Sequence, residues 1–225
     1  FSAPVRLRMQ RERSELAFLM GHDRDAFNRW DAGQELATRL LLELAGHAAA
    51  GRPLGLDPDY SAAFGRLLAD PQLDGSLKAL ALGLPGERLL GQEMEVIDPD
   101  AVHVARDFMR RELARAHREE LRRAYEDCVQ QERGYRADRE AIDRRRLKNA
   151  ALAYLASLGE SGTTALAMRQ FESSDNMTDC QAALEGLVDV AGPERERALA
   201  SFYARWRHDP LVLDKWFAVQ ALCQL

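Results

Sequence analysis

The sequence predicts an all-α protein: an irregular α-solenoid, or superhelical array, of antiparallel helix pairs, preceded by a short β-hairpin. Two features of the composition indicate this fold. The strong helix formers Ala, Leu, Arg and Glu dominate the 225 residues, whereas Val, Ile and Thr, which favour strands, are scarce. The third observation is periodicity, because apolar residues after position 22 recur at the steps of three and four that make one helical face.

The hairpin is expected in residues 1–21, which differ from the rest of the chain. Residues 3–9 alternate between apolar and polar side chains, the period of a half-buried strand. A polar stretch at 10–15 and a short apolar run at 16–20 then suggest a turn and a second strand. Because an isolated two-stranded hairpin is marginal in water, these strands should pack on other elements.

Start and stop signals divide residues 22–225 into helices. Asp23 is the expected cap of the first helix, which Gly51 and Pro53 end; its apolar face is read as Phe27, Trp30, Ala37, Leu41, Leu44 and Ala48. Asp-Pro pairs at 57–58 and 98–99 open further helices, since proline suits the first helical position. The second of these is expected to be the longest, reaching about residue 131. The other expected helices cover residues 73–82, 86–94, 139–158, 163–171, 177–190, 194–207 and 211–224.

The charge and the cysteines restrict the classes of partner and location. The formal net charge of −5 gives no overall attraction to phosphate, so we expect no nucleic-acid partner. No apolar run approaches the roughly 18–20 residues that cross a bilayer, so we expect no membrane association. Three widely spaced cysteines, Cys128, Cys180 and Cys223, fit reduced thiols packed as small hydrophobes, which favours a cytoplasmic location.

Local catalytic motifs are absent from the sequence. A thermolysin-type zinc site needs two histidines four residues apart with a glutamate between them, and no two of the five histidines have that spacing. The sequence holds no Cys-x-x-Cys pair, no glycine-rich nucleotide loop and no Gly-x-Ser-x-Gly. We therefore predict no catalytic, cofactor-binding or metal-binding residue in this chain.

Two segments stand out from the helical background. Residues 174–179 join two helices and are rich in capping residues, so their simplest interpretation is a helix start with Asn176 or Asp175 as the cap. Residues 213–217 place a charged pair, Asp214 and Lys215, beside the aromatic Trp216. Such a segment more often packs its aromatic rings inward than binds a ligand.

Four segments, in this order along the chain, resemble the bacterial aminopeptidase N family of thermolysin-like zinc aminopeptidases. They are Phe1-Ser2-Ala3-Pro4-Val5, Phe27-Asn28-Arg29-Trp30-Asp31-Ala32, Asn176-Met177-Thr178-Asp179 and Asp214-Lys215-Trp216-Phe217. The resemblance covers essentially the whole chain and lies in the region that follows the family's catalytic domain.

The resemblance implies a division of the chain and a role. Residues 1–21 would be the terminal hairpin of a β-sandwich domain, and residues 22–225 most of the C-terminal helical domain. The parent enzyme would remove N-terminal amino acids from peptides with one zinc held in its catalytic domain, whose ligands have no counterpart here. This part would cover the active-site chamber and gate the entry of peptides. The candidates for lining the substrate channel are Asn176, Met177, Asp179, Asp214, Lys215 and Trp216.

The leading hypothesis is thus a non-catalytic helical part of an aminopeptidase N, with peptide substrates and the catalytic domain as partners. The absence of an initiator Met and of a stop signal in the last helix leads us to expect a piece of a longer protein, able to self-associate through truncated apolar faces. The alternative is a stand-alone helical-repeat scaffold that binds a protein partner in its concave face.

Overall fold

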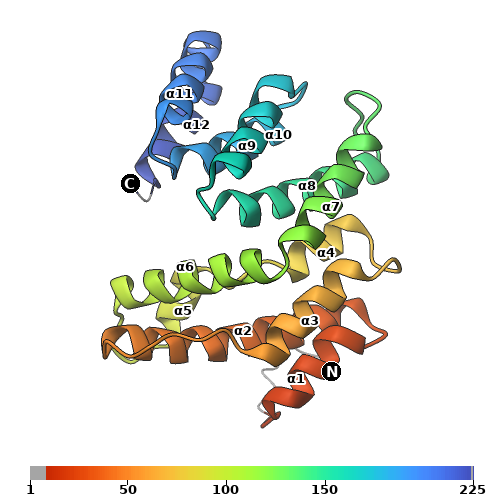
Figure 1. Ribbon diagram of the computed structural model, residues 1–225, viewed down its shortest axis with the longest axis vertical. Helices are drawn as coiled ribbons and strands as arrows, with labels where there is room; N and C mark the ends of the chain where they lie inside the picture. Colours follow the sequence, from red (N-terminus) through yellow and green to blue (C-terminus); the bar gives the residue numbers. More distant parts are fainter. Residues whose placement is uncertain (1–8, 224) are drawn as a thin grey trace, which may run out of the picture.

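Twelve α-helices and no strand make up residues 9–223 and 225, the part of the chain that the computed structural model describes (Figure 1). The expected all-α fold is therefore confirmed. The helices are α1 (Arg13–His22), α2 (Ala26–Ala49), α3 (Pro58–Ala69), α4 (Gly75–Ala81), α5 (Glu87–Gln92), α6 (Pro99–Ala116), α7 (Arg118–Gln130), α8 (Arg139–Ala156), α9 (Ser161–Ser173), α10 (Met177–Val188), α11 (Pro193–Trp206) and α12 (Pro210–Ala221).

Aspartate caps followed by proline begin three of these helices. Asp57 accepts a hydrogen bond from the Tyr60 N–H at 2.8 Å, which satisfies one of the free donors at the start of α3. Asp98 and Asp209 cap α6 and α12 in the same way. The start signals expected at 57–58 and 98–99 thus locate α3 and α6 correctly, whereas the cap and proline of α12 were not recognised in the sequence.

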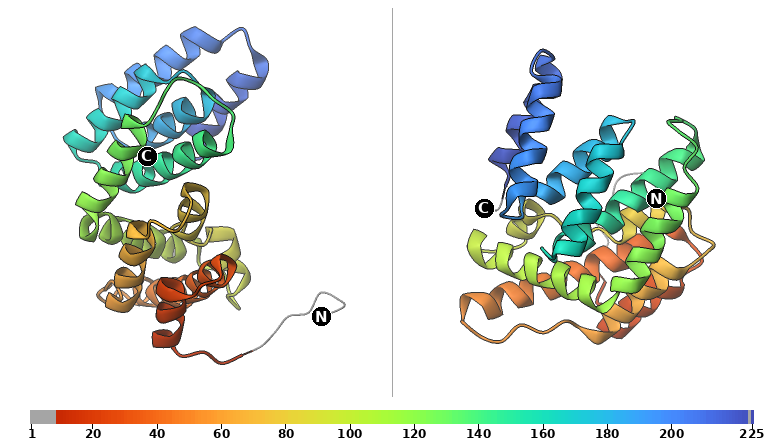
Figure 2. Two further views of the ribbon diagram at one scale, coloured as in Figure 1. Left: turned by 90° about the vertical axis from the view of Figure 1, so that its right-hand side faces the viewer. Right: turned by 45° about the horizontal axis from the view of Figure 1, so that its top comes forward.

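The helices follow one another as packed pairs along an extended array (Figures 1 and 2). At one end α2 packs between α1 and α6, and α3 lies against α1. Helices α7 and α4 both pack on α8, which links this end to the pairs α9–α10 and α11–α12 at the other. One continuous buried cluster runs through the array from Leu16 to Val219.

The prediction of a second hairpin strand is wrong, because residues 16–20 lie within α1. Leu16, Ala17 and Met20 are buried, and these positions share one helical face, whereas a strand would point Leu16 and Ala17 to opposite sides. This face packs on α2 and α3, which decides in favour of helix. The first expected strand, residues 3–9, lies outside the described residues except for Met9, and the division of the chain at residues 21 and 22 stays a prediction.

The helix expected from residue 98 to about 131 is two helices, α6 and α7, separated at His117. The His117 imidazole hydrogen-bonds to the Ser61 hydroxyl at 3.0 Å and packs on the Phe64 ring, with 5.3 Å between centroids. These contacts with α3 hold the backbone of His117 outside the helical region, at φ −117° and ψ 27°. The break is a product of tertiary packing, and no glycine or proline marks it in the sequence.

The start of α2 also differs from the expectation. Asp25, and not Asp23, is the cap, and it accepts from the N–H groups of Phe27 and Asn28. Phe27, read as part of the inner face, is 65% exposed. The inner face is shifted around the helix and is formed by Ala32, Leu36, Ala37, Leu40, Leu41, Leu44 and Ala45.

Candidate functional site

The first turn of α10 places two of the candidate residues in one polar cluster. Asn176 caps the helix, since its side-chain oxygen accepts from the Asp179 N–H at 3.0 Å. The Asp179 carboxylate, 2% exposed, in turn accepts from the Asn176 side-chain amide at 3.0 Å. The cap satisfies one main-chain donor at the helix start, and the second hydrogen bond joins the two side chains to each other.

A lysine from α8 neutralises the buried Asp179. The Lys148 ammonium, on a residue that is 3% exposed, donates to Asp179 at 2.7 Å and also to the Glu132 carboxylate in the loop after α7. A buried charge is tolerated only when it is paired and hydrogen-bonded. The ion pair therefore ties the first turn of α10 to α8 and to the α7–α8 loop.

Two amides complete this group of contacts. Asn149 on α8 donates to the second Asp179 oxygen at 2.8 Å. Gln170 on α9 donates from its side-chain nitrogen to the Asn149 oxygen at 2.8 Å and to the Asp179 main-chain carbonyl at 3.0 Å. We call Glu132, Lys148, Asn149, Gln170, Asn176 and Asp179 the Asp179 network. It joins α8, α9 and α10 at one point.

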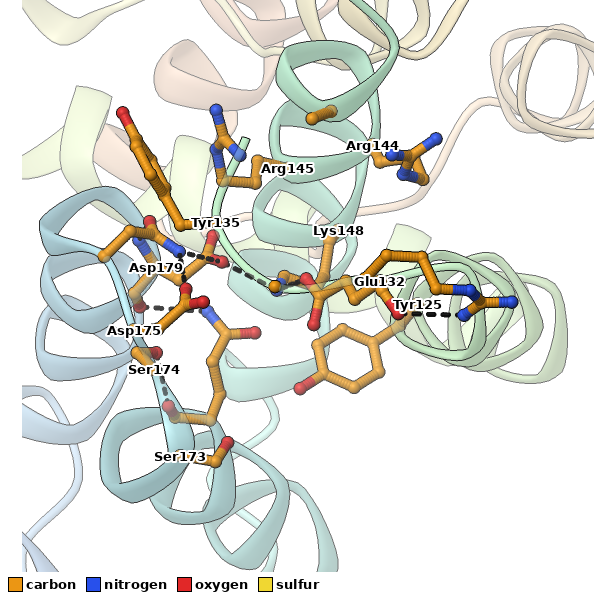
Figure 3. Close-up of a pocket in the computed structure, with 15 residues that line it drawn as sticks. Tyr125, Glu132, Tyr135, Arg144, Arg145, Lys148, Ser173, Ser174, Asp175 and Asp179 are labelled. Carbon is orange, nitrogen blue, oxygen red and sulfur yellow. Dashed lines mark hydrogen bonds and ion pairs between the residues drawn. The ribbon is translucent and has the colours of Figure 1, made fainter. Parts of the chain in front are cut away.

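The Asp179 network lies against a small polar pocket with a volume of about 120 Å³. Figure 3 shows Asp175 and Asp179 on one side of it, with Lys148, Glu132 and Tyr125 on the other. Burial, together with the nearby Glu132 carboxylate, raises the pKa of the Tyr125 phenol to about 12, so this group stays protonated at neutral pH. Arg145 also lines the pocket, and its guanidinium carbon lies over the Tyr135 ring, 5.2 Å from the ring centroid.

The second candidate segment lies on α12 and has mixed roles. Trp216 packs on α11, where its indole N–H donates to the Leu199 carbonyl at 3.0 Å and its ring contacts Tyr203. Asp214 is exposed. Lys215 lines a shallow groove together with Met177 of α10, so the structure brings one member of each candidate segment together there.

The sequence interpretation missed Lys148, Asn149 and Gln170, although a signal was present. Lys148 lies on the same helical stripe as Ala151, Leu152 and Leu155, all buried. A lysine within a buried stripe indicates a buried partner, which only the fold identifies as Asp179.

Other chemistry is sparse in the described part of the chain. Residues 9–223 and 225 contain no group of three or more His, Cys, Asp or Glu side chains able to hold a metal ion. None of the helices in that part has the length and apolar character needed to cross a membrane. Burial raises the pKa of the Cys128 thiol to about 11, so it remains a thiol rather than a reactive thiolate.

The fold is that of a helical-repeat domain, in which each helix pair packs on its neighbours. The Asp179 network adds buried hydrogen bonds between α8, α9 and α10. Residues 13–225 match the family model described as "Domain of unknown function (DUF3458_C) ARM repeats". The chain belongs to this family of helical-repeat domains.

The sequences most similar to this chain include proteins named aminopeptidase N, the family that the four motifs resemble. The chain is 41% identical over 221 residues to aminopeptidase N of Caulobacter vibrioides and 39% identical over 223 residues to aminopeptidase N of Escherichia coli. Each match covers 98% of this chain and 25% of the relative, so the chain spans about a quarter of the length of these proteins. The suspected relationship to bacterial aminopeptidase N is confirmed.

A solved structure shows the same architecture. The crystal structure of Legionella pneumophila aminopeptidase A in complex with aspartic acid superposes with a TM-score of 0.84 at 25% identity. The match covers all of this chain and 27% of that one. The chain thus corresponds to the C-terminal helical part of aminopeptidase N-type proteins.

Proposed function

We propose that this chain is the non-catalytic helical part of a zinc aminopeptidase, and that it covers the active-site chamber and gates the entry of peptides. The observation that carries the proposal is the 41% identity to aminopeptidase N over 98% of the chain. The parent protein would remove N-terminal amino acids from peptides, using one zinc held by residues outside this chain. We also propose that it acts in the cytoplasm.

The contacts of the candidate residues support a structural role for most of them rather than a catalytic one. Asp179 and Lys148, the most deeply buried charged pair of the candidate region, satisfy each other and neighbouring amides. Trp216 is used to attach α12 to α11. Among the substrate-channel candidates, Asp214 is exposed, and Lys215 and Met177 line one shallow groove, so we assign the proposed contact with peptide to these three.

The catalytic part of the proposal is tested with the purified 225-residue chain. We expect no stoichiometric zinc by elemental analysis and no hydrolysis of alanyl or leucyl chromogenic amides. The full-length protein that contains the chain is the positive control. Activity that rises in proportion to the purified chain and is abolished by a chelator would contradict the proposal.

Gating is tested in the full-length protein with substrates of increasing size. If helices cover the chamber, kcat/KM should be high for tripeptides and fall sharply for a folded protein with the same accessible N-terminal residue. Equal rates for the unfolded and the folded form of one substrate protein would exclude a gate.

The rival function, a stand-alone scaffold for a protein partner, is favoured by the extended array of helix pairs (Figure 2). The coding sequence distinguishes the two. A reading frame that continues upstream and encodes a His-Glu-x-x-His helix supports the aminopeptidase. A start codon directly before Phe1 and a stop after Leu225 would support the scaffold.

A further inference from the structure

The chain contains three lysines, and each lies in a different environment. Lys148 is 3% exposed, and its ammonium group is held by the carboxylates of Asp179 and Glu132. Lys215 of α12 lines the shallow surface groove beside α10. Lys78 of α4 is half-buried, yet no carboxylate in the described part of the chain is close enough to form an ion pair with it. A partly buried ammonium group without a paired carboxylate calls for an explanation.

A single hydrogen bond holds the Lys78 amine in place. It donates to the main-chain carbonyl of Leu68, in the last turn of α3, at 3.0 Å. The Asp70 carboxylate attracts the ammonium group from beyond ion-pair distance, but this carboxylate is bonded to Arg29 at 2.6 Å. The Cys128 thiol, with its pKa raised to about 11, carries no charge at neutral pH and so does not balance the lysine.

Burial is the main influence on the reactivity of this amine. It lowers the pKa of Lys78, and the Arg29 guanidinium acts in the same direction, whereas Asp70 acts against both. The neutral, nucleophilic form of Lys78 is therefore more abundant at neutral pH than in a solvated lysine. Lysines that are desolvated in an apolar pocket or lie beside another cation are those that form Schiff bases with carbonyl compounds.

Lys78 lines an open cavity with a volume of about 550 Å³, between the α3–α4 turn, α4, α7 and α8. Small-molecule sites usually have volumes of roughly 300–1,000 Å³, so the cavity is of a suitable size for a ligand. Much of its wall is apolar and can remove a carbon chain from water. The apolar residues of the wall include Leu68, Pro71, Leu73, Ala124, Cys128 and Leu147.

The charges of the cavity lining balance one another, so they select neither a cationic nor an anionic ligand. What the cavity offers is an amine beside apolar walls, which suits an uncharged molecule with an apolar body and a carbonyl group that reacts with amines. The cations of the lining are Lys78, Arg123 and Arg144, and the anions are Glu120, Asp127 and Asp143.

We propose that Lys78 is a modification site, at which an aldehyde with an apolar body condenses with the side-chain amine and places that body in the cavity. The amine nitrogen attacks the carbonyl carbon to form a C–N bond. The carbonyl oxygen then leaves as water with two of the three ammonium protons, which gives a protonated imine. The imine keeps one N–H, enough for the hydrogen bond to the Leu68 carbonyl. The reaction uses no oxidant or reductant, and the site is separate from the proposed peptidase function.

The test is labelling of the 225-residue chain with two aldehydes near neutral pH. Hexanal has an apolar body, and glyoxylate has a carboxylate in its place. Sodium cyanoborohydride reduces each imine to a stable amine, and mass spectrometry of the peptides gives the labelling rate at each lysine. We expect the ratio of the Lys78 rate to the Lys215 rate to be at least about tenfold higher with hexanal than with glyoxylate. The same ratio for both aldehydes, or a hexanal rate at Lys78 no greater than at Lys215, overturns the proposal.

A variant pair locates the apolar body of the aldehyde. Ala124 lines the cavity from α7, so Ala124→Phe fills part of the space and should slow hexanal labelling of Lys78 by at least about fivefold. Ala153→Phe makes the same change at an exposed position of α8 outside the cavity, and this control should be labelled as the unchanged chain is. Equal rates in both variants would contradict the cavity as the site.

If Ala124→Phe does not fold, the comparison of the two aldehydes on the unchanged chain decides alone. Neither measurement involves hydrolysis of a peptide, so a failure here leaves the peptidase proposal untouched.

Discussion

Arg29, in the second of the four motifs, is buried at 5% exposure and connects three helices through its guanidinium group. It donates to the carbonyls of Met20 and Gly21 at 3.1 Å, which lie at the end of α1, and to the Asp70 carboxylate at 2.6 Å after α3. Free carbonyls at a helix end need donors, and a guanidinium group can serve several acceptors at once. The motif residue thus has a structural role.

The Arg29–Asp70 pair leads to a pH prediction. Hydrogen bonds from Arg29 and from the Gln72 N–H lower the pKa of Asp70 below its usual value of 3.8. Because the folded pKa is depressed, the pair stabilises the fold fully above about pH 4, and this contribution is lost as the pH falls through the lower folded pKa. We expect Asp70→Asn to lower the free energy of unfolding by about 1–3 kcal/mol at pH 7.

The measurement is urea unfolding of both proteins from pH 7 to pH 2.5, where the difference should shrink. Asp214→Asn, a change at an exposed carboxylate on α12, is the control and should alter stability by less than about 0.5 kcal/mol. A difference that stays constant down to pH 2.5 would show that the ionised carboxylate is not responsible.

At the scale of elements, the break between α6 and α7 depends on a close approach to α3. A Cβ atom added to Gly65 of α3 would lie 2.8 Å from the ring of His117, inside van der Waals contact. The ring is held in place by Ser61 and Phe64, so it has little freedom to move aside. Glycine is therefore required at this position by packing, in spite of its low helix propensity.

A pair of glycine substitutions tests this packing. Gly65→Ala should destabilise the protein by about 1–2 kcal/mol, since the clash outweighs the gain in helix propensity. Gly46→Ala is the matched control in α2, where an added Cβ meets nothing within 4 Å, and it should stabilise by up to about 1 kcal/mol. Thermal unfolding of the two variants gives the comparison. Equal stabilisation by both alanines would mean that the α3–His117 contact is loose.

At the scale of the whole molecule, the last helix presents two strongly exposed leucines to solvent. Leu211 in the first turn of α12 and Leu222, the residue after its end, are 80% and 82% exposed and lie on one side of the helix with the exposed Ala218. Asp214 and Lys215 lie between Leu211 and Ala218 on that side. We call Leu211, Ala218 and Leu222 the α12 stripe, since exposed leucines grouped on one side of a helix favour association. This α12 stripe is a concrete location for the self-association expected from the sequence.

We therefore expect the purified chain to form dimers or larger species as its concentration rises, as measured by light scattering. Replacing both Leu211 and Leu222 by Asp should shift the chain toward monomer, because burying two carboxylates is unfavourable. Val96→Asp is the control, since Val96 is also 80% exposed but lies between α5 and α6. An unchanged chain that stays monomeric at high concentration would rule out the α12 stripe as an interface.

The sequence by itself determined the fold class and most of the helix starts. Asp57-Pro58 and Asp98-Pro99 specify a cap and a first helical residue through local hydrogen bonds, so no distant contact is needed to place them. Asn176 was likewise recognisable as a cap. The relationship to aminopeptidase N was also present in four short motifs.

The tertiary structure alone decided the features that depend on distant partners. Residues 16–20 fit a strand or a helix locally, and packing against α2 and α3 made them helical. His117 interrupts a helix because Ser61 and Phe64, more than fifty residues earlier, hold its ring. Lys148 and Gln170 meet Asp179 only when α8, α9 and α10 pack together. Local patterns encode local hydrogen bonds, whereas a buried charge and its partner are joined by the fold.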